Sequence, residues 1–170
     1  MKEIDVKDLS FNPFMRIKKE WMLVTAGTEE GGYNTMTASW GHLGSVWGND
    51  GGAPTTVIYV RPQRYTKEFV DKNDLYTLCF FDGRKEELMY LGVKSGRDED
   101  KVAKVGFTPA FGDGFTYFEE ASLVLVCRKL YSAPILEENF IDKTIAEKIY
   151  SQKDFHQMYI GEVVKVLSGE

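Results

Sequence analysis

The stretch Asn34-Thr35-Met36-Thr37-Ala38-Ser39-Trp40 is the clearest structural signal in this sequence. Hydroxyl side chains alternate in it with apolar ones, and a period of two is typical of a half-buried β-strand. Hydroxyl groups both donate and accept hydrogen bonds, so a row of them suits a flat, polar-edged, phosphorylated ligand. An amphipathic strand whose threonines face water explains the same pattern, and this stretch alone does not separate the two.

A second strand is expected just before this one. Residues Trp21–Thr28 are mostly apolar, and a turn with two glycines at residues 29–32 separates them from residues 34–40. Two strands joined by a Gly-Gly turn predict a β-hairpin. Two more glycines follow directly, in residues 41–44. We interpret this segment as a loop, because glycine permits turns and close approach to a ligand.

The remaining sequence adds further strands, with helices between some of them. Strand patterns fill residues 54–60, 75–81, 117–135 (one long bent strand or two) and 158–167, and helical patterns fill residues 67–72, 84–91, 98–105 and 141–150. Residues 1–20 have little periodicity and are expected to form a loop. Strands in short succession favour a closed or nearly closed antiparallel barrel with added helices. No GxGxxG motif follows a strand, which disfavours a doubly wound parallel sheet.

The composition bounds the class of protein. The chain has 170 residues, of which 43% are hydrophobic and 28% charged, and its formal net charge is −5. It fits a single domain, residues 1–170, with a hydrophobic core, and its acidic balance argues against a nucleic-acid or anionic-membrane partner. The N-terminus has no signal-peptide pattern, and the longest clear apolar run, Leu123–Cys127, is too short to span a bilayer. We therefore expect a cytoplasmic protein.

Cysteine and histidine are too sparse to predict a metal site. Cys79 and Cys127 each lie in an apolar strand-like run and do not form a CxxC pair, and the chain has two histidines. Free cysteine is among the most buried residue types. We expect both cysteines to be buried and no metal to be bound.

Two arginines mark a candidate anion site. Arg61, Arg64 and Thr66 lie in one turn that leads into the helix expected at residues 67–72, and Thr66 can serve as its N-cap. The planar fork of arginine grips phosphate, and a helix N-terminus presents free N–H groups. Pro62 stiffens the turn. A solvated turn with incidental arginines is the alternative interpretation.

Several motifs, taken in order, resemble one known family. NTMTASW is followed by VRPQRYT (residues 60–66), KSGRDEDK (94–101), FEEASLVLVCRKLY (118–131) and HQMYIGEV (156–163). This ordered set is similar to the FMN-binding split-barrel proteins of the flavin reductase family, and above all to the branch called flavoredoxin-like. Each motif alone has low specificity, whereas the ordered set, from about Trp21 to Leu167, is specific.

The resemblance implies a fold, a cofactor and a set of binding residues. The implied fold is mostly β: a six-stranded Greek-key split barrel with flanking helices, which dimerises and holds FMN near the subunit interface. The family binds the flavin ring and ribityl chain along the strand matching residues 34–40, and the phosphate on the loop matching residues 61–66. The segment matching residues 94–97 approaches the flavin in some members. The implied FMN-binding residues are Asn34, Thr35, Met36, Thr37, Ala38, Ser39, Trp40, Arg61, Gln63, Arg64, Tyr65, Thr66, Lys94, Ser95, Gly96 and Arg97.

His156 is the one candidate catalytic side chain. In reductases of the family the matching histidine lies on the nicotinamide side, and a structural role at the start of the last strand is the alternative. The implied activity is that of an NAD(P)H-dependent FMN reductase, with hydride transferred to flavin N5 and a redox protein as a candidate acceptor. A flavoredoxin-like electron carrier with tightly bound FMN and no nicotinamide-dependent turnover is the competing hypothesis, and the sequence does not separate the two. A relative that binds a different ligand is disfavoured, because strand and phosphate loop both look intact.

Overall fold

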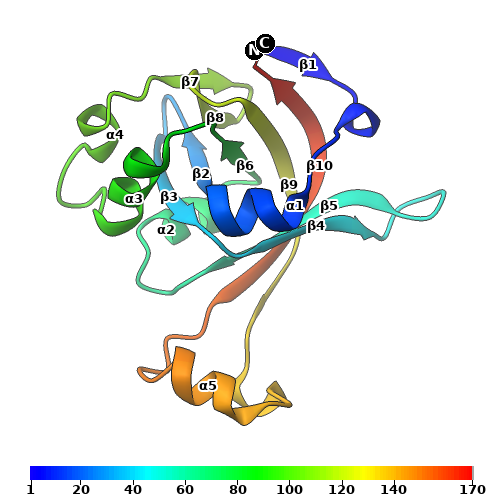
Figure 1. Cartoon of the computed structure of the whole chain (residues 1–170), viewed down its shortest axis with the longest axis vertical. Coiled ribbons are helices and arrows are strands. Elements are labelled where there is room, and N and C mark those ends of the chain that lie inside the picture. Colours follow the sequence, from blue (N-terminus) through cyan, green and yellow to red (C-terminus); the bar gives the residue numbers. More distant parts are fainter. Residues whose placement is uncertain (170) are drawn as a thin grey trace.

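The computed structural model describes residues 1–169, and its central feature is a curved antiparallel sheet (Figure 1). The sheet has eight strands in the order β3-β2-β6-β9-β10-β5-β4, with β1 paired to β10. A separate hairpin pairs β7 with β8. The strands are β1 (Lys2–Ile4), β2 (Met22–Thr28), β3 (Gly32–Ala38), β4 (Gly41–Val46), β5 (Ala53–Val60), β6 (Leu75–Phe80), β7 (Pro109–Gly112), β8 (Phe115–Phe118), β9 (Leu123–Pro134) and β10 (Gln157–Ser168).

The main sheet has eight strands where the sequence predicts six. The loop expected at residues 41–44 is wrong, because this segment is the start of β4 and pairs with β5, from Gly41 opposite Ile58 to Val46 opposite Ala53. The short strand β1 was also not expected. Residues 117–135 divide into β8 and β9, the second of the two alternatives left open by the sequence. The β2–β3 hairpin forms as predicted, with Thr25 opposite Thr35.

Helices pack against both faces of the sheet and lie at the tip of an extension (Figure 1). We call residues 135–156, between β9 and β10, the arm; α5 lies at its end, away from the barrel. Residues 13–20, expected as a loop, are helical instead. No helix within residues 1–169 is long and apolar enough to cross a membrane. The helices are α1 (Pro13–Met15) with the π-helical turn Arg16–Glu20, α2 (Thr66–Lys72), α3 (Lys85–Val93), α4 (Lys101–Lys104) and α5 (Lys143–Ile149), with short 3-10 turns at Val6–Asp8 and Glu137–Asn139.

Strand β2 separates two hydrophobic cores. Met22 and Val24 pack into the barrel interior with residues such as Phe80, whereas Leu23 faces a second core beneath α3 and the β7–β8 hairpin. All three side chains are completely buried. Successive side chains of a strand point to opposite faces, so burial of both faces explains why β2 is apolar without alternation. Both cysteines are buried and free, as predicted.

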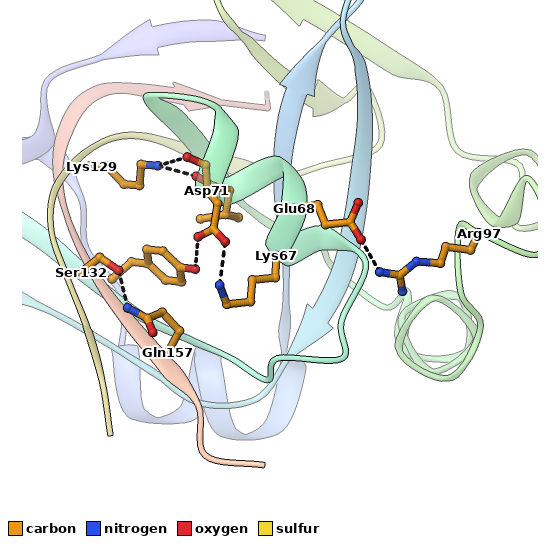
Figure 2. Close-up of polar contacts among 9 residues, drawn as sticks. Lys67, Glu68, Asp71, Arg97, Lys129, Ser132 and Gln157 are labelled. Carbon is orange, nitrogen blue, oxygen red and sulfur yellow. Dashed lines mark hydrogen bonds and ion pairs between the residues drawn. The ribbon is translucent and has the colours of Figure 1, made fainter. Parts of the chain in front are cut away.

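A polar network fastens α2 to the strands at the base of the arm (Figure 2). The Asp71 carboxylate accepts hydrogen bonds from Lys67 at 2.6 Å and from the hydroxyl of Tyr159, on β10, at 2.5 Å. Lys129, on β9, donates to the main-chain carbonyl oxygens of Val70 and Asp71. The turn that precedes α2 is therefore held on a helix that cannot shift without breaking these bonds.

Candidate functional site

Strand β3 leads from one cavity to another. Asn34 and Met36 line a small cavity, and Ser39 and Trp40, which follow the strand, line a large one. A strand rises about 3.3 Å per residue, so residues 34–40 extend over roughly 20 Å. An elongated ligand with different chemistry at its two ends can therefore lie along this strand.

The threonine hydroxyls of β3 do not form a free row. The Thr35 hydroxyl is buried and shares a 2.7 Å hydrogen bond with the Thr25 hydroxyl on β2. The Thr37 hydroxyl donates to the carbonyl oxygen of Leu88, on α3, at 2.5 Å. Both hydroxyls thus bind protein atoms and do not form the free row that the alternation suggests, while contact of these residues with FMN stays a prediction. The alternation correctly predicted the strand, but it could not show which face of the strand other parts of the protein would cover.

The small cavity, which we call the cationic pocket, has a volume of about 170 Å³. It gathers ten of the predicted FMN-binding residues from β3, the turn before α2 and the loop after α3. Its lining also contains four basic side chains and no carboxylate among the described residues. The lining residues are Asn34, Met36, Arg61, Gln63, Arg64, Tyr65, Thr66, Val93, Lys94, Ser95, Gly96 and Lys101.

Two basic residues of this pocket are held only by main-chain carbonyl groups. Arg64 donates to the carbonyl oxygen of Gly92 at 2.6 Å, and Lys101 donates to those of Leu91 and Lys94 at 2.8 and 3.0 Å. Within residues 1–169 neither forms an ion pair with a carboxylate. Buried charges are normally paired, because removing an ion from water costs free energy. Two such cations side by side therefore indicate a site for an anion.

Placing two positive charges together away from water has an electrostatic cost, which lowers the pKa values of Arg64 and Lys101. Burial lowers the pKa of Arg64, and the charge of Arg61 lowers it further. Burial also lowers the pKa of Lys101 to about 8, with repulsion from Arg64 as the second cause. An anion in the pocket would favour the charged form of each side chain.

Arg61 and Arg97 are bound differently from Arg64. Arg61 pairs with Asp154 and lies over the ring of Tyr150 at 5.2 Å. Arg97 pairs with Glu68 and lies over the ring of Tyr65 at 4.5 Å. Although Arg97 belongs to the predicted set, its side chain does not line the pocket. It links the loop after α3 to α2.

Asn34 and Thr66 form the floor of the cationic pocket. The Asn34 amide donates to the Thr66 hydroxyl at 2.8 Å, and both side chains are buried. Gly96 lies directly above, where a Cβ atom would come within 2.1 Å of the Asn34 side-chain oxygen. The N-cap role predicted for Thr66 is wrong, because α2 begins at this residue and Tyr65 occupies the cap position without a side-chain hydrogen bond.

The large cavity, which we call the apolar groove, has a volume of about 960 Å³. It lies between the N-terminal helical segment, the β3–β4 connection and the arm. Most of its lining is aromatic or aliphatic, and its polar contacts include His42, whose ring accepts from or donates to the Tyr59 hydroxyl at 3.2 Å. The lining residues are Pro13, Phe14, Ile17, Lys18, Trp21, Ser39, Trp40, Gly41, His42, Leu43, Tyr59, Ile135, Phe140, Ile145, Ile149 and Tyr150.

His156 lies behind the wall of this groove and lines neither cavity. Its ring is buried, shares a 2.7 Å hydrogen bond with the Tyr150 hydroxyl, and packs 5.1 Å from the ring of Trp40. Burial lowers the pKa of His156 to about 4, and the charges of Arg61 and Arg64 act in the same direction. The imidazole is therefore neutral at pH 7 and is a member of an aromatic cluster.

Lys101 is the residue of the site that the sequence interpretation missed. It ends the KSGRDEDK motif, but three acidic residues precede it, and such a charge run normally indicates a solvated surface. The structure instead leaves Lys101 4% exposed, against the cationic pocket. No group of three or more potential metal ligands occurs among the described residues.

Comparison with known proteins identifies the family of this fold and site. The model of the flavin reductase like domain matches residues 14–170, and the chain belongs to that family. The resemblance inferred from the sequence motifs is confirmed, as is the split-barrel fold class. Comparison with curated protein sequences returned no significant match.

Solved structures with this fold share little sequence with the chain. Flavoredoxin from Methanosarcina acetivorans is 22% identical, with a TM-score of 0.64 over 89% of this chain and 69% of that one. An FMN-binding domain of a flavin reductases-like enzyme from Shewanella baltica is 16% identical, with a TM-score of 0.67 over 98% and 76%. The FMN-binding protein from Thermus thermophilus is 20% identical, with a TM-score of 0.65 over 100% and 83%.

Proposed function

We propose that the chain is a flavoprotein that binds FMN along β3, with the phosphate in the cationic pocket. One observation carries this proposal: Arg64 and Lys101, with no carboxylate partner among the described residues, meet beside the middle of the strand, and the apolar groove begins where the strand ends. FMN has a phosphate at one end and an apolar ring system at the other, so its polarity matches that of the two cavities. FMN-binding proteins among the structural neighbours support the same assignment.

The chain's own residues would bind and orient the cofactor. Arg64 offers charge-assisted hydrogen bonds to the phosphate, while Asn34 and Thr66 hold the pocket floor. Trp40, which is 45% exposed, provides an aromatic surface for the ring system at the edge of the groove. When bound, FMN supplies the redox chemistry, including hydride acceptance at N5.

We propose that the protein acts as an NAD(P)H-dependent flavin reductase in the cytoplasm. The apolar groove has room for a second ring compound beside the flavin, and a water-excluding site that aligns the two reacting rings would supply the main rate acceleration. A redox protein is a candidate acceptor of the electrons. His156 would have a structural role here, packed against Trp40 and bonded to Tyr150, because its ring reaches neither cavity.

A flavoredoxin-like electron carrier is the second candidate function. The burial of His156 supports this hypothesis. The residue is the candidate for a nicotinamide contact, and it lies behind Tyr150 and Trp40. Flavoredoxin from Methanosarcina acetivorans has the same fold. Under this hypothesis FMN stays bound and NAD(P)H does not reduce it at a useful rate.

We also propose that two copies form a homodimer across the apolar groove. The arm projects from the barrel (Figure 1) and presents an aliphatic ridge on α5 and just before it, where Ile141 is 99%, Ile145 44% and Ile149 40% exposed. A second copy would cover this ridge and close the groove around the flavin ring. A twofold dimer uses the same surface patch on both subunits.

The first experiment is a visible spectrum of the purified protein, followed by thermal unfolding with FMN or riboflavin. FMN at a hundred times its dissociation constant should add about 2.7 kcal/mol of stability, and riboflavin at equal concentration should add less. Absence of any shift with excess FMN would contradict the proposal. Anaerobic mixing with NADH or NADPH then distinguishes the reductase, which bleaches at about 450 nm, as reduced flavins do, from the carrier, which does not.

A further inference from the structure

We propose that Lys101 couples FMN binding to proton uptake: its side chain recognises the phosphate as an ammonium group and takes a proton from solvent when the ligand enters at alkaline pH. This inference rests on the proposed FMN function and adds to it a residue and a pH dependence. Riboflavin, which has the same ring system without the phosphate, should bind without this proton.

The geometry leaves Lys101 ready to bind an anion. The side chain is 4% exposed and lines the cationic pocket from α4, across from Arg64. An ammonium group has three N–H donors, and two of them bind the carbonyl oxygens of Leu91 and Lys94. Among residues 1–169 no acceptor lies within hydrogen-bond distance of the third N–H, which can therefore bind a phosphate oxygen in the pocket.

The charges around Lys101 make its protonation sensitive to a ligand. Arg64 faces it from the turn before α2, and Arg61 and Lys94 add positive charge to the same pocket. Glu99 is the opposing charge, and its carboxylate accepts a hydrogen bond from the Tyr90 hydroxyl on α3 at 2.9 Å. The groups that bind Lys101 directly are neutral carbonyls. In the free protein, therefore, little negative charge stabilises its ammonium group.

These surroundings set the direction of the pH effect. Burial and Arg64 lower the pKa of Lys101 to about 8 in the free protein, and a phosphate monoester, dianionic above pH 6 or so, raises it again. Between those two pKa values the complex holds one more proton than the separate partners. FMN affinity should therefore fall less than about twofold from pH 7 to 8 and then by up to about tenfold per pH unit.

The test measures FMN and riboflavin binding to the full chain between pH 7 and 9.5, with calorimetry at pH 8.5 in two buffers of different ionisation enthalpy. We expect FMN affinity to fall about ten- to thirtyfold across this range, with proton uptake, while riboflavin affinity stays flat. Riboflavin also corrects for any ionisation of the ring system. Equal pH profiles for the two ligands, or no proton uptake with FMN, would overturn the role of Lys101.

Two substitutions locate the proton. Lys101→Arg keeps the charge throughout this pH range, so FMN should still bind but without the pH dependence. Lys101→Met should weaken FMN about tenfold or more at pH 7 and riboflavin less than threefold, again without the pH dependence. Lys104→Met, on the exposed face of the same helix, is the matched control and should behave as wild type.

The outcomes also separate this inference from the proposed function. Retention of the wild-type pH profile in a folded Lys101→Arg protein assigns the proton to another group and overturns the inference, while FMN binding stands. If Lys101→Met does not fold, the wild-type profile and Lys101→Arg still decide the matter. Failure of the wild-type protein to bind FMN at any pH overturns both proposals.

Discussion

The cationic pocket and the apolar groove lie along the same strand, β3, and are built on opposite principles. The pocket is small and polar, and its walls are fixed by main-chain carbonyl bonds and by the Arg97–Glu68 ion pair. The groove is more than five times larger, at 960 against 170 Å³, and apolar side chains on three separate segments form most of it. The pocket is therefore formed within one chain, whereas we expect the groove to be closed by a ligand or a second subunit.

This difference predicts which changes each region should tolerate. Removing the charge of Arg64 or Lys101 should affect the pocket and leave assembly unchanged, because these two cations contact main chain outside the arm, whereas Arg61 pairs with Asp154 in the arm. Adding a charge on the arm should affect assembly and leave phosphate recognition unchanged. The substitutions below test this separation.

The largest effect, on the pH dependence of folding stability, is expected at His156, which packs between the two regions. Its folded pKa of about 4 lies below its ordinary 6.5, so the unfolded chain binds the extra proton between these values. Stability from this group is present above pH 6.5 and is lost, by about 3 kcal/mol, as the pH falls to 4. Chemical denaturation of wild type and His156→Gln should show a shallower pH dependence in the variant.

His156→Ala separates a structural role from a role in the reaction. We expect lower stability and an unchanged rate of NAD(P)H oxidation per folded, flavin-loaded molecule, because the ring is bonded to Tyr150 and lines neither cavity. A slower rate at constant FMN affinity and melting temperature would instead assign His156 to the nicotinamide.

The next effect is expected at Arg64. Arg64→Ala should weaken FMN by roughly 1.5–3 kcal/mol, or about ten- to hundredfold, through loss of a charge-assisted hydrogen bond. Thr66→Ala should act in the same direction, and riboflavin should change less in both variants. Fluorescence titration measures the two affinities; equal losses for FMN and riboflavin would place the phosphate elsewhere.

A smaller effect, on dimer formation, is expected from a substitution in the arm. Ile145→Asp should raise the dimer dissociation constant by about tenfold or more, because it places a charge in the apolar ridge. Analytical ultracentrifugation measures this, with Glu147→Ala on the exposed part of the same helix as the control. A monomeric wild-type protein with FMN bound would contradict the dimer.

The smallest effect is expected at Arg97. Its ion pair with Glu68 is solvent-exposed on both sides, and such pairs contribute about 0–1 kcal/mol. Arg97→Ala should therefore change FMN affinity less than fivefold or so. A loss as large as that of Arg64→Ala would make Arg97 a direct phosphate contact and blur the boundary of the pocket.

Features that depend on local sequence could be predicted. Features that depend on contacts with other strands and helices could not. The alternation in residues 34–40 predicted β3, and Arg64 and Thr66 do line one pocket. The direction of the Thr35 and Thr37 hydroxyls depended on β2 and α3, which the alternation does not specify. Residues 41–44 were misassigned because their glycines suggested a turn, whereas Gly41 lies in a strand where space is tight: a Cβ there would lie 2.8 Å from the Met22 methyl group and 3.1 Å from the carbonyl oxygen of Val57.

The site itself was predictable only in part. Lys101 was hidden by the acidic residues before it, since no local pattern shows that α4 turns this one side chain into the protein. The arm was equally hidden, because the helix at residues 143–149 was expected but its position beyond the barrel is a tertiary property.

The central claim is that the cationic pocket binds the phosphate of FMN, and a crystal structure of the FMN complex tests it most directly. We expect phosphate oxygens about 2.7–3.2 Å from nitrogen atoms of Arg64 and Lys101, with the flavin ring along β3 toward Trp40. A phosphate in solvent or in the apolar groove, with Arg64 still bonded only to Gly92, would contradict it.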